Sequence, residues 1–594
     1  AYEDMQEQLQ EPFYNIDHVE YIKGSASAIF GQSEPGGVIN LVTKKPLPFK
    51  RYEFDVTTGS YNEYRFMTDF TGAVSKSKKF LYRFVAGYEN SKALDRNQHI
   101  ENIFIAPQIE YMPSLKTSVR LSIQYSYDDR IVFDGTGVPA FFDTTAQKFI
   151  PGYYSPRTSL NSVLGRAYSN KLFSEISFTH NFSDKIKFTS LLLLLNAKNT
   201  VTLTELTLDA SYLLTSDSIP VSNAIQSVNH FSGQSSSFAN FKFNTGFLSH
   251  NLVAGIDLHF WKEDLMHADI EQRNVYVPNP DLTWGIYNFN EAYKNLNDYN
   301  NSFGYKANDY GAGVYSNDLI SFGDKWKLFA GIRFDYFRDV PNPFYPANTS
   351  LFKDTSKTTT VYPKTGLIWQ PSKNISFYIL YNRGFYPQHF SDKGYGGPFP
   401  PEKSAEFELG TKLQLMQGNL LITASAFSIQ QYNIVVGDTI PNQLRLLKHL
   451  YSKGIDFSVQ GKLTKYLNVM GNYSFNITKI GNSDSFFIQK NQQFPGVPRN
   501  AANAWLNYEI FKTGISVGAG FNYTSVRTTF TNGFLLPAYT TVDAGLSYTI
   551  HKFRLACNLY NITNERYWTS GSSSVSIYPG NPFSFRFNIN YLIQ

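Results

Sequence analysis

Glycines, histidines and carboxylates are the residues of this chain that could carry chemistry. The segment Gly31–Gly37 has the glycines of a phosphate-binding loop, but it lacks the Lys-Ser/Thr pair that such a loop needs. Glycines at these positions permit tight turns and close backbone approach. We therefore interpret the segment as structural scaffold and not as a ligand contact.

The histidines and the cysteine do not predict a catalytic or metal centre. None of the ten histidines forms an H-x-H or H-E-x-x-H pattern. His259, with Glu263, Asp264 and His267, is the only cluster of metal-ligand types, and we expect it to lie in an exposed polar loop. No Ser-His-Asp or paired-carboxylate spacing is recognisable, and Cys557 is alone. The sequence predicts no enzyme, no resident metal and no cofactor.

Two carboxylates have positions that define a polar surface. Glu408 alternates with Phe407 and Leu409, and Asp456 follows Ile455 in the same kind of pattern. Successive side chains of a strand point to opposite faces. Both carboxylates should therefore lie on the polar face of their strands.

The elements that position these residues are strands with one apolar and one polar face. The alternation is clear in Ser118–Tyr127, Leu467–Phe475, Val542–Ile550 and Phe583–Ile593. The chain holds 50 phenylalanines and 41 tyrosines, while charged residues make up only 17%. A soluble sandwich would show the same alternation, but a barrel with aromatic residues facing lipid fits this composition better. The apolar run Leu191–Leu195 is far too short for a membrane-spanning helix of about 20 residues.

Turn lengths predict the number of strands. Ten tight turns alternate with longer connections such as 128–168, 262–308, 383–402 and 477–500. Ten short turns between eleven longer connections require 22 strands, and short turns at one end with long loops at the other are typical of outer-membrane barrels. The predicted tight turns lie at residues 75–79, 112–116, 183–185, 248–251, 323–325, 371–373, 416–419, 463–465, 511–514 and 551–552.

A barrel of this size has a lumen that needs a plug. We expect residues 1–47 to be the last part of the plug and residues 48–594 to form an all-β, 22-stranded antiparallel transmembrane barrel. The chain starts at Ala1 and shows no signal peptide, so we expect that further plug residues precede it. The net charge of +5 is small and dispersed, which gives no basis for binding nucleic acid.

Several motifs resemble one family along the whole chain. Val19–Gly31 followed by Pro35–Pro46 is similar to the end of the plug in TonB-dependent outer-membrane receptors, closest to the ferrichrome and ferric-siderophore branch. One departure is Ser25, where that family usually has proline. Further similar segments are Gly59–Asn62 with Arg65, Asp128–Arg130, Pro401–Lys412, Gly454–Asp456 and Asn558–Trp568.

The resemblance implies a contact between the plug and the barrel wall. In the family, plug arginines pair with two acids of the wall, and the matching positions are Lys23, Glu408 and Asp456. Lysine and aspartate keep the charges but shorten the reach and lose the bidentate fork of arginine. We therefore expect a salt-bridge lock between Lys23 and these two acids; the alternative is a surface lysine and two solvated lumenal acids.

The resemblance also implies the function: active import of a ferric siderophore of hydroxamate type across the bacterial outer membrane. The TonB–ExbB–ExbD complex would supply the energy through an upstream TonB box, and the protein would act as a monomer among outer-membrane lipids. Iron would stay chelated by the siderophore. Loop aromatics expected to touch the ligand are Phe133, Phe385, Tyr386 and Tyr395. Other cargo (cobalamin, haem, a peptide or a glycan), a passive porin and an outer-membrane hydrolase remain as alternatives.

The lock can be tested directly. Replacing Lys23 by alanine should loosen the plug, because its two carboxylate partners would lose their cation. Exchange or release of the plug is the measurement, and an unchanged rate in the variant would contradict the lock.

Overall fold

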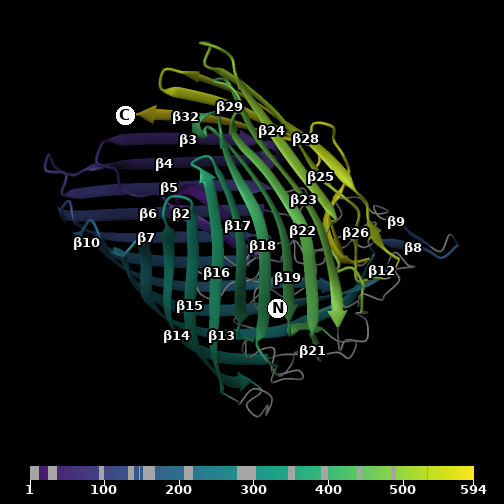
Figure 1. Ribbon diagram of the computed structural model, residues 1–594. Coiled ribbons are helices and arrows are strands. Elements are labelled where there is room, and N and C mark those ends of the chain that lie inside the picture. Colours follow the sequence, from purple (N-terminus) through teal and green to yellow (C-terminus); the bar gives the residue numbers. More distant parts are fainter. Residues whose placement is uncertain are drawn as a thin grey trace.

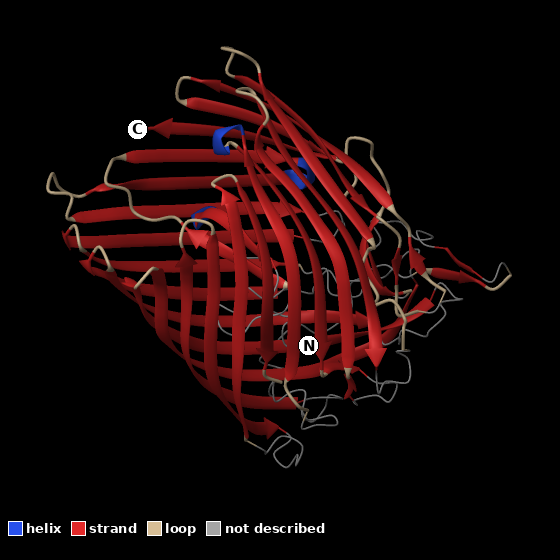
Figure 2. Ribbon diagram, viewed as in Figure 1, coloured by secondary structure: helices blue, strands red, loops and turns tan. Residues whose placement is uncertain are grey.

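The computed structural model describes residues 13–23, 36–92, 99–131, 140–145, 148–150, 167–206, 218–276, 303–345, 355–388, 399–437, 444–482, 490–531, 533–574 and 576–594. Within these ranges, 22 antiparallel strands form one closed barrel, as predicted (Figure 1). In the described ranges, strands make up nearly all the regular structure (Figure 2), and the helical pieces there are the 3-10 turns η1 (Phe13–Asn15), η3 (Ser60–Asn62) and η6 (Met416–Gly418). No helix in the described part is both long and apolar enough to cross a membrane.

The barrel strands follow the chain around the ring, and the last pairs with the first. In ring order they are β3 (Arg51–Gly59), β4 (Glu63–Ala73), β5 (Phe80–Lys92), β6 (His99–Ser114), β7 (Thr117–Arg130), β10 (Ala167–Ser183), β11 (Ile186–Leu206), β12 (Ser218–Thr245), β13 (Leu248–Tyr276), β14 (Phe303–Phe322), β15 (Trp326–Tyr345), β16 (Ser356–Ser372), β17 (Ile375–Tyr386), β18 (Glu402–Leu415), β19 (Leu420–Tyr432), β22 (His449–Lys462), β23 (Leu467–Asn482), β24 (Asn500–Glu509), β25 (Ile515–Thr524), β28 (Tyr539–Ile550), β29 (Phe553–Tyr560) and β32 (Ser584–Ile593).

Strands β3 and β32 close the ring at a seam between the two ends of the barrel sequence. Val56 pairs with Ile589 in the antiparallel register of this seam. The Arg586 side chain donates to Glu63 at 2.7 Å, and the Phe585 amide donates to the Ser60 hydroxyl at 3.0 Å. Contacts between residues more than 500 positions apart thus complete the wall.

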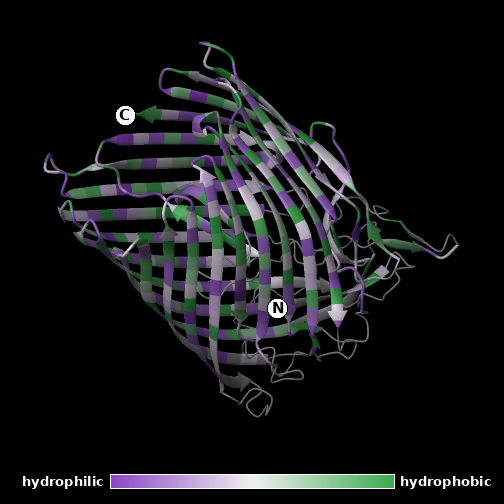
Figure 3. Ribbon diagram, viewed as in Figure 1, coloured by the Kyte–Doolittle hydropathy of each residue, from purple (hydrophilic) through white to green (hydrophobic). Residues whose placement is uncertain are grey.

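The apolar faces of the strands point outward. Leu121 and Ile123 are 41% and 36% exposed, whereas Ser122 between them is only 7% exposed. Hydrophobic and hydrophilic residues alternate along the strands in Figure 3. A sandwich would bury the apolar faces in its core, so the predicted lipid-facing barrel is the arrangement that the structure has.

Nine of the ten predicted tight turns include residues that join two neighbouring strands. The turn predicted at 248–251 lies two residues earlier, at Gly246-Phe247, because β12 ends at Thr245 and β13 starts at Leu248. Gly246 and Gly323 have φ values of +61° and +62°, a conformation that glycine adopts without steric cost.

At the opposite end, three of the four expected long connections match to within a few residues, and the fourth differs greatly. The connection expected at 262–308 is shorter, because β13 runs to Tyr276 and β14 begins at Phe303. Four small hairpins lie in connections at this end: β8 (Phe141–Asp143) with β9 (Lys148–Ile150), β20 (Ile434–Gly437) with β21 (Leu444–Leu447), β26 (Arg527–Thr528) with β27 (Leu535–Leu536), and β30 (Trp568–Ser573) with β31 (Ser576–Pro579).

Three of these hairpins pack together. Phe534, Trp568 and Ile577 belong to one buried apolar cluster, which also includes Ala140 and Leu536. The Arg527 guanidinium donates to the Trp568 carbonyl at 2.6 Å. Connections from distant parts of the chain therefore pack against one another at this end.

The exterior position of Leu409 gives a test of the lipid-facing surface. Leu409 is 50% exposed and lies on the outward face of β18. The change Leu409→Arg should reduce the free energy of unfolding by about 2–4 kcal/mol, because it places a cation in hydrocarbon. Asn472→Arg, at an exposed position of the inner face of β23, should change it by less than about 1 kcal/mol. Urea unfolding in lipid vesicles measures both, and equal losses would contradict the assignment of the two faces.

Candidate functional site

A small sheet near the amino terminus lies against the inside of the barrel. Strands β1 (Ile16–Lys23) and β2 (Gly37–Thr43) pair with each other and not with the barrel. Tyr14, just before β1, packs on Val85, Phe104 and Ala106, which are buried on the inner faces of β5 and β6. Its ring lies over Gly87, where an added Cβ would come within 2.7 Å of it. The glycine therefore makes room for the tyrosine.

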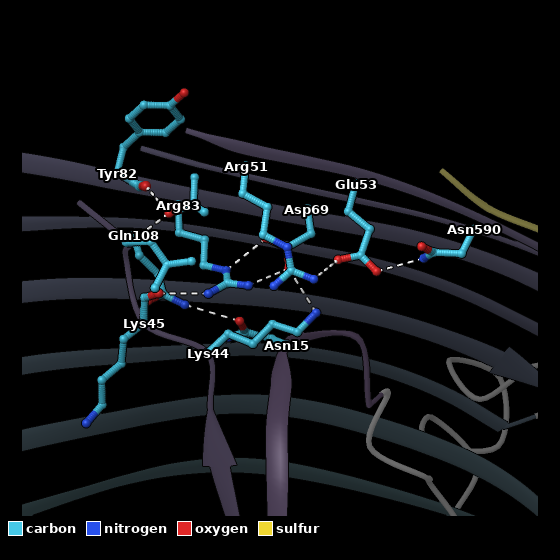
Figure 4. A network of polar contacts seen from close by, with 12 residues as sticks. Asn15, Lys44, Lys45, Arg51, Glu53, Asp69, Tyr82, Arg83, Gln108 and Asn590 are labelled. Atoms are coloured by element: carbon cyan, nitrogen blue, oxygen red, sulfur yellow. Dashed lines mark hydrogen bonds and ion pairs between the residues drawn. The ribbon is translucent and has the colours of Figure 1, made fainter. Parts of the chain in front are cut away.

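Three charged residues, which we call the anchor cluster, join this sheet to the wall (Figure 4). Lys44, which directly follows β2, donates to Asp69 Oδ2 at 3.0 Å. Arg83 of β5 donates to both oxygens of the Asp69 carboxylate, at 2.8 and 2.5 Å. Because Asp69 and Arg83 are 2% and 4% exposed, water screens this cluster little.

Hydrogen bonds extend the attachment on both sides of the anchor cluster (Figure 4). Arg83 also donates to the Lys45 carbonyl at 2.7 Å, and Gln108 of β6 donates to Asn15 Oδ1 at 3.2 Å. The Leu47 amide donates to the Thr71 hydroxyl at 2.9 Å. The start of β1 and the end of β2, which lie at the same end of the small sheet, are thus attached to the three strands β4 to β6.

The Tyr14 hydroxyl contributes a further polar contact. It donates to Glu89 Oε2 at 3.5 Å. Burial, followed by the negative charge of Glu89, raises the pKa of the Tyr14 phenol. The hydroxyl therefore stays protonated and remains a donor at physiological pH.

The acids of the expected lock lie on the far side of the barrel from the anchor cluster. Strand β18, which carries Glu408, is eleven strands from β5 in either direction around the ring. Glu408 and Asp456 belong to inner faces, since their neighbours Leu409 and Ile455 are 50% and 52% exposed to the outside. Glu408 accepts a hydrogen bond from the Tyr378 hydroxyl at 2.6 Å, and Asp456 pairs across the sheet with Ser425.

Lys23 ends β1 and pairs with Gly37. Its side chain lies outside the described residues, so its contact with Glu408 and Asp456 stays a prediction. An eight-residue strand is about 25 Å long, so β1 is long enough to separate Lys23 well from the anchor cluster.

The structure places two of the four aromatic residues that were expected to touch the ligand, and their contact with a ligand stays a prediction. Phe133 and Tyr395 lie outside the described residues. Phe385 and Tyr386 were expected in a loop, but they are the last two residues of β17. Phe385 is 5% exposed and stacks on Phe337 with 6.1 Å between ring centroids. It belongs to a buried aromatic cluster of the wall, and this packing explains why the strand continues to Tyr386.

The histidine cluster also lies in a strand. The expectation of an exposed polar loop is wrong, because residues 259–267 belong to β13, which pairs with β12 and β14 along this stretch. His259 is on the inner face, where its ring lies 5.2 Å from that of Phe337. No group of three or more metal-ligand side chains is found within the described ranges.

Next to His259 the inner wall is hollowed by a cavity of about 400 Å³. We call it the wall cavity. Arg333 lies at its surface and donates to Asp257 at 2.6 Å and to Asp335 at 2.8 to 3.0 Å. Gly313 leaves space for these groups, since an added Cβ would lie 2.3 Å from the Arg333 guanidinium. The lining residues are Phe173, Leu193, Leu195, Ser232, Gly233, Gln234, Asp257, His259, Phe260, Trp261, Arg333, Asp335 and Phe337.

The anchor cluster was not identified from the sequence, although it is the clearest attachment of the small sheet in the described residues. Lys44 lies in the matched plug-end motif, but its partners come from two strands without any recognisable motif. A signal was present: Asp69 and Arg83 occupy inner-face positions of neighbouring strands, with opposite charges two residues apart in register.

Removing the central carboxylate tests the anchor cluster. In Asp69→Ala the Arg83 cation stays buried without its main partner, a change that costs about 3–5 kcal/mol. We expect residues 13–47 to become accessible to protease in outer-membrane preparations. Glu175→Ala is the control, since it breaks an Arg120 pair of 2.6 Å elsewhere on the wall. Protection of residues 13–47 in Asp69→Ala equal to that in the control would contradict the anchoring role.

Comparisons with known proteins agree with this architecture. The chain is 25% identical over 604 residues to the metal-pseudopaline receptor CntO of Pseudomonas aeruginosa, which covers 97% of this chain and 80% of that receptor. It is 23% identical over 594 residues to the ferrioxamine B receptor of Salmonella typhimurium, covering 95% of the chain and 78% of the receptor. Among solved structures, the siderophore receptor PiuA of Acinetobacter baumannii superposes with a TM-score of 0.86 at 21% identity, over 98% of this chain and 87% of that one.

The family comparison covers most of the barrel. The model of the family described as "TonB dependent receptor-like, beta-barrel" matches residues 110–562. The closed 22-strand wall and the sheet attached to its inner face fit the receptors named above. The chain therefore belongs to the TonB-dependent receptor family of the bacterial outer membrane.

Proposed function

We propose that this receptor imports a ferric siderophore across the outer membrane, driven by TonB. The observation that carries the proposal is the small sheet attached inside the lumen by the anchor cluster, because a passive pore needs no such obstruction. The names of the relatives, a ferrioxamine B receptor among them, support a ferric chelate as the cargo. We place no cofactor in the protein, since the chelate itself holds the iron.

The arrangement of charges supports different roles for the two ends of the small sheet. The anchor cluster keeps Lys44 and the end of β2 on the β4–β6 wall. Glu408 and Asp456 line the lumen on the far side, where a salt bridge to Lys23 would hold the other end of β1. Force transmitted from TonB through upstream residues would then break contacts at the far side first, because Asp69 and Arg83 of the anchor cluster are more buried than Asp456. Import requires that the receptor shift from a state that binds the cargo tightly to one that binds it weakly. The applied force supplies the difference in free energy between these two states.

A second cargo has a specific observation in its favour. The relative that covers 97% of this chain is named as a receptor for metal-pseudopaline. A metal chelate of a different kind from a hydroxamate would enter by the same route. The cargo remains a metal chelate in both cases.

Growth under iron limitation tests the proposed function. In a strain lacking its own siderophore receptors, expression of this protein should restore growth on a ferric trihydroxamate, because the chelate is too large for ordinary porins. The same strain without TonB should not grow, whereas a passive pore would work without it. Restored growth without TonB, or no growth with any ferric chelate or with metal-pseudopaline, would refute the proposal.

A further inference from the structure

The tight turns of the barrel are rich in lysine. Each turn consists of the residues between two consecutive barrel strands at the short-turn end. Eight of the ten turns carry at least one lysine, and together they hold ten lysines and two aspartates. We call these ten the turn lysines: Lys76, Lys78, Lys79, Lys116, Lys185, Lys325, Lys373, Lys465, Lys512 and Lys552.

Folding gathers charge that is dispersed along the sequence. Because alternate connections of an antiparallel ring lie at the same end, all ten turns lie where β32 finishes (Figure 1). Ten lysines and two aspartates give the turns a net charge of +8, whereas the whole chain has only +5. The excess of positive charge is therefore concentrated at this end of the barrel, and the remaining residues together are net negative.

The turn lysines are exposed and have no carboxylate partner. All ten side chains lie in exposed residues. Within the described ranges none of the ten forms an ion pair, and the turn acids Asp184 and Asp324 form none either. The ammonium groups are therefore available to an anion from outside the chain.

The geometry of the turns does not require lysine. Tight turns favour glycine, asparagine, aspartate and serine. Lys78 and Lys512 have φ values of +54° and +58°, a region in which the Cβ of an ordinary side chain is crowded. Gly246 and Gly323 occupy the same region in two other turns without this cost. Lysine at these positions opposes the backbone preference, which indicates a role for its charge.

Outward aromatic side chains place the turn lysines at the level of lipid headgroups. Phe80 directly follows Lys79, and Trp326 directly follows Lys325. The two rings are 46% and 44% exposed on the outer face, and Phe80 stacks on Tyr111 with 4.5 Å between ring centroids. Aromatic girdles of membrane barrels lie where hydrocarbon meets the headgroups. A lysine one residue beyond such a ring lies among the headgroups themselves.

We propose that the turn lysines form a rim that binds the phosphate groups of anionic phospholipids in the adjoining leaflet, which for the short-turn end of a barrel is the periplasmic one. The rim is continuous with the lipid-facing surface. A lipid whose acyl chains cover Phe80 therefore has its phosphate beside Lys79. The charge is densest at residues 74–79 and 115–116, two turns that the Met112 amide joins by donating to the Lys79 carbonyl at 2.7 Å.

Lipid selectivity at the perimeter of the barrel tests the proposal. The full chain is reconstituted in phosphatidylcholine vesicles that contain a trace of spin-labelled phosphatidylglycerol or spin-labelled phosphatidylcholine. The motionally restricted fraction of each label gives its relative affinity for the barrel. Phosphatidylglycerol should associate about threefold more tightly at low salt, since lysine near a membrane surface attracts anionic headgroups. The preference should shrink as salt screens the charges.

The variant Lys76→Gln/Lys78→Asn/Lys79→Gln/Lys116→Gln removes the charge where it is densest. It should fold, because the four residues are exposed and asparagine accepts positive φ more readily than lysine. The preference for phosphatidylglycerol should fall by about half, since the other turn lysines remain. The matched control replaces the same four lysines by arginine, which keeps the charges and should keep the preference.

Equal affinity of the two lipids for the unmodified chain, or an unchanged preference in the neutral variant, overturns the inference. Loss of the preference in the arginine control also overturns it, because charge would then not be the cause. If the unmodified chain shows no lipid preference but binds polyglutamate in detergent through the same four lysines, the rim recognises a soluble acidic partner and not lipid. Chelate import stands in each case, because no step of it depends on the rim.

Discussion

Satisfaction of backbone hydrogen bonds in hydrocarbon is the constraint on which the rest of the molecule depends. A strand in lipid has no water to pair with, so every N–H and C=O must find a partner on a neighbouring strand. A closed ring meets this requirement for all 22 strands, with β3 and β32 completing each other at the seam. Closure places the polar side chains in a shared lumen, where ionised groups can meet.

The charged side chains of the lumen are arranged differently on two sides of the barrel. On the β4–β6 side, Lys44 and Arg83 both pair with Asp69 and hold the small sheet in place. Around β13–β16, Arg333 pairs with Asp257 and Asp335 at the surface of the wall cavity. The first arrangement attaches a separate piece of the chain to the wall, whereas the second joins strands of the wall to one another.

The sequence allowed the repetitive part of the structure to be predicted and left the irregular part open. The alternation of apolar and polar residues and the ten short turns predicted the ring. The alternation is visible in the sequence because the outer face of each strand contacts lipid, and the tight turns are visible because they need few residues. His259 and Phe385 were wrongly expected in loops, since polar or aromatic composition does not reveal that β13 and β17 continue. Predicting the anchor cluster requires the register between β4 and β5, and no sequence motif reveals that register. The contact that the resemblance implies between Lys23 and the acids Glu408 and Asp456 stays a prediction, because the Lys23 side chain is not described.

The seam has a consequence for biogenesis. Its two strands come from opposite ends of the barrel sequence, so the cylinder can close only after β32 has been synthesised. The small sheet precedes β3 in the chain, so it is synthesised before the two edges of the wall can meet. The order of translation therefore makes the piece inside the lumen available before the cylinder can close.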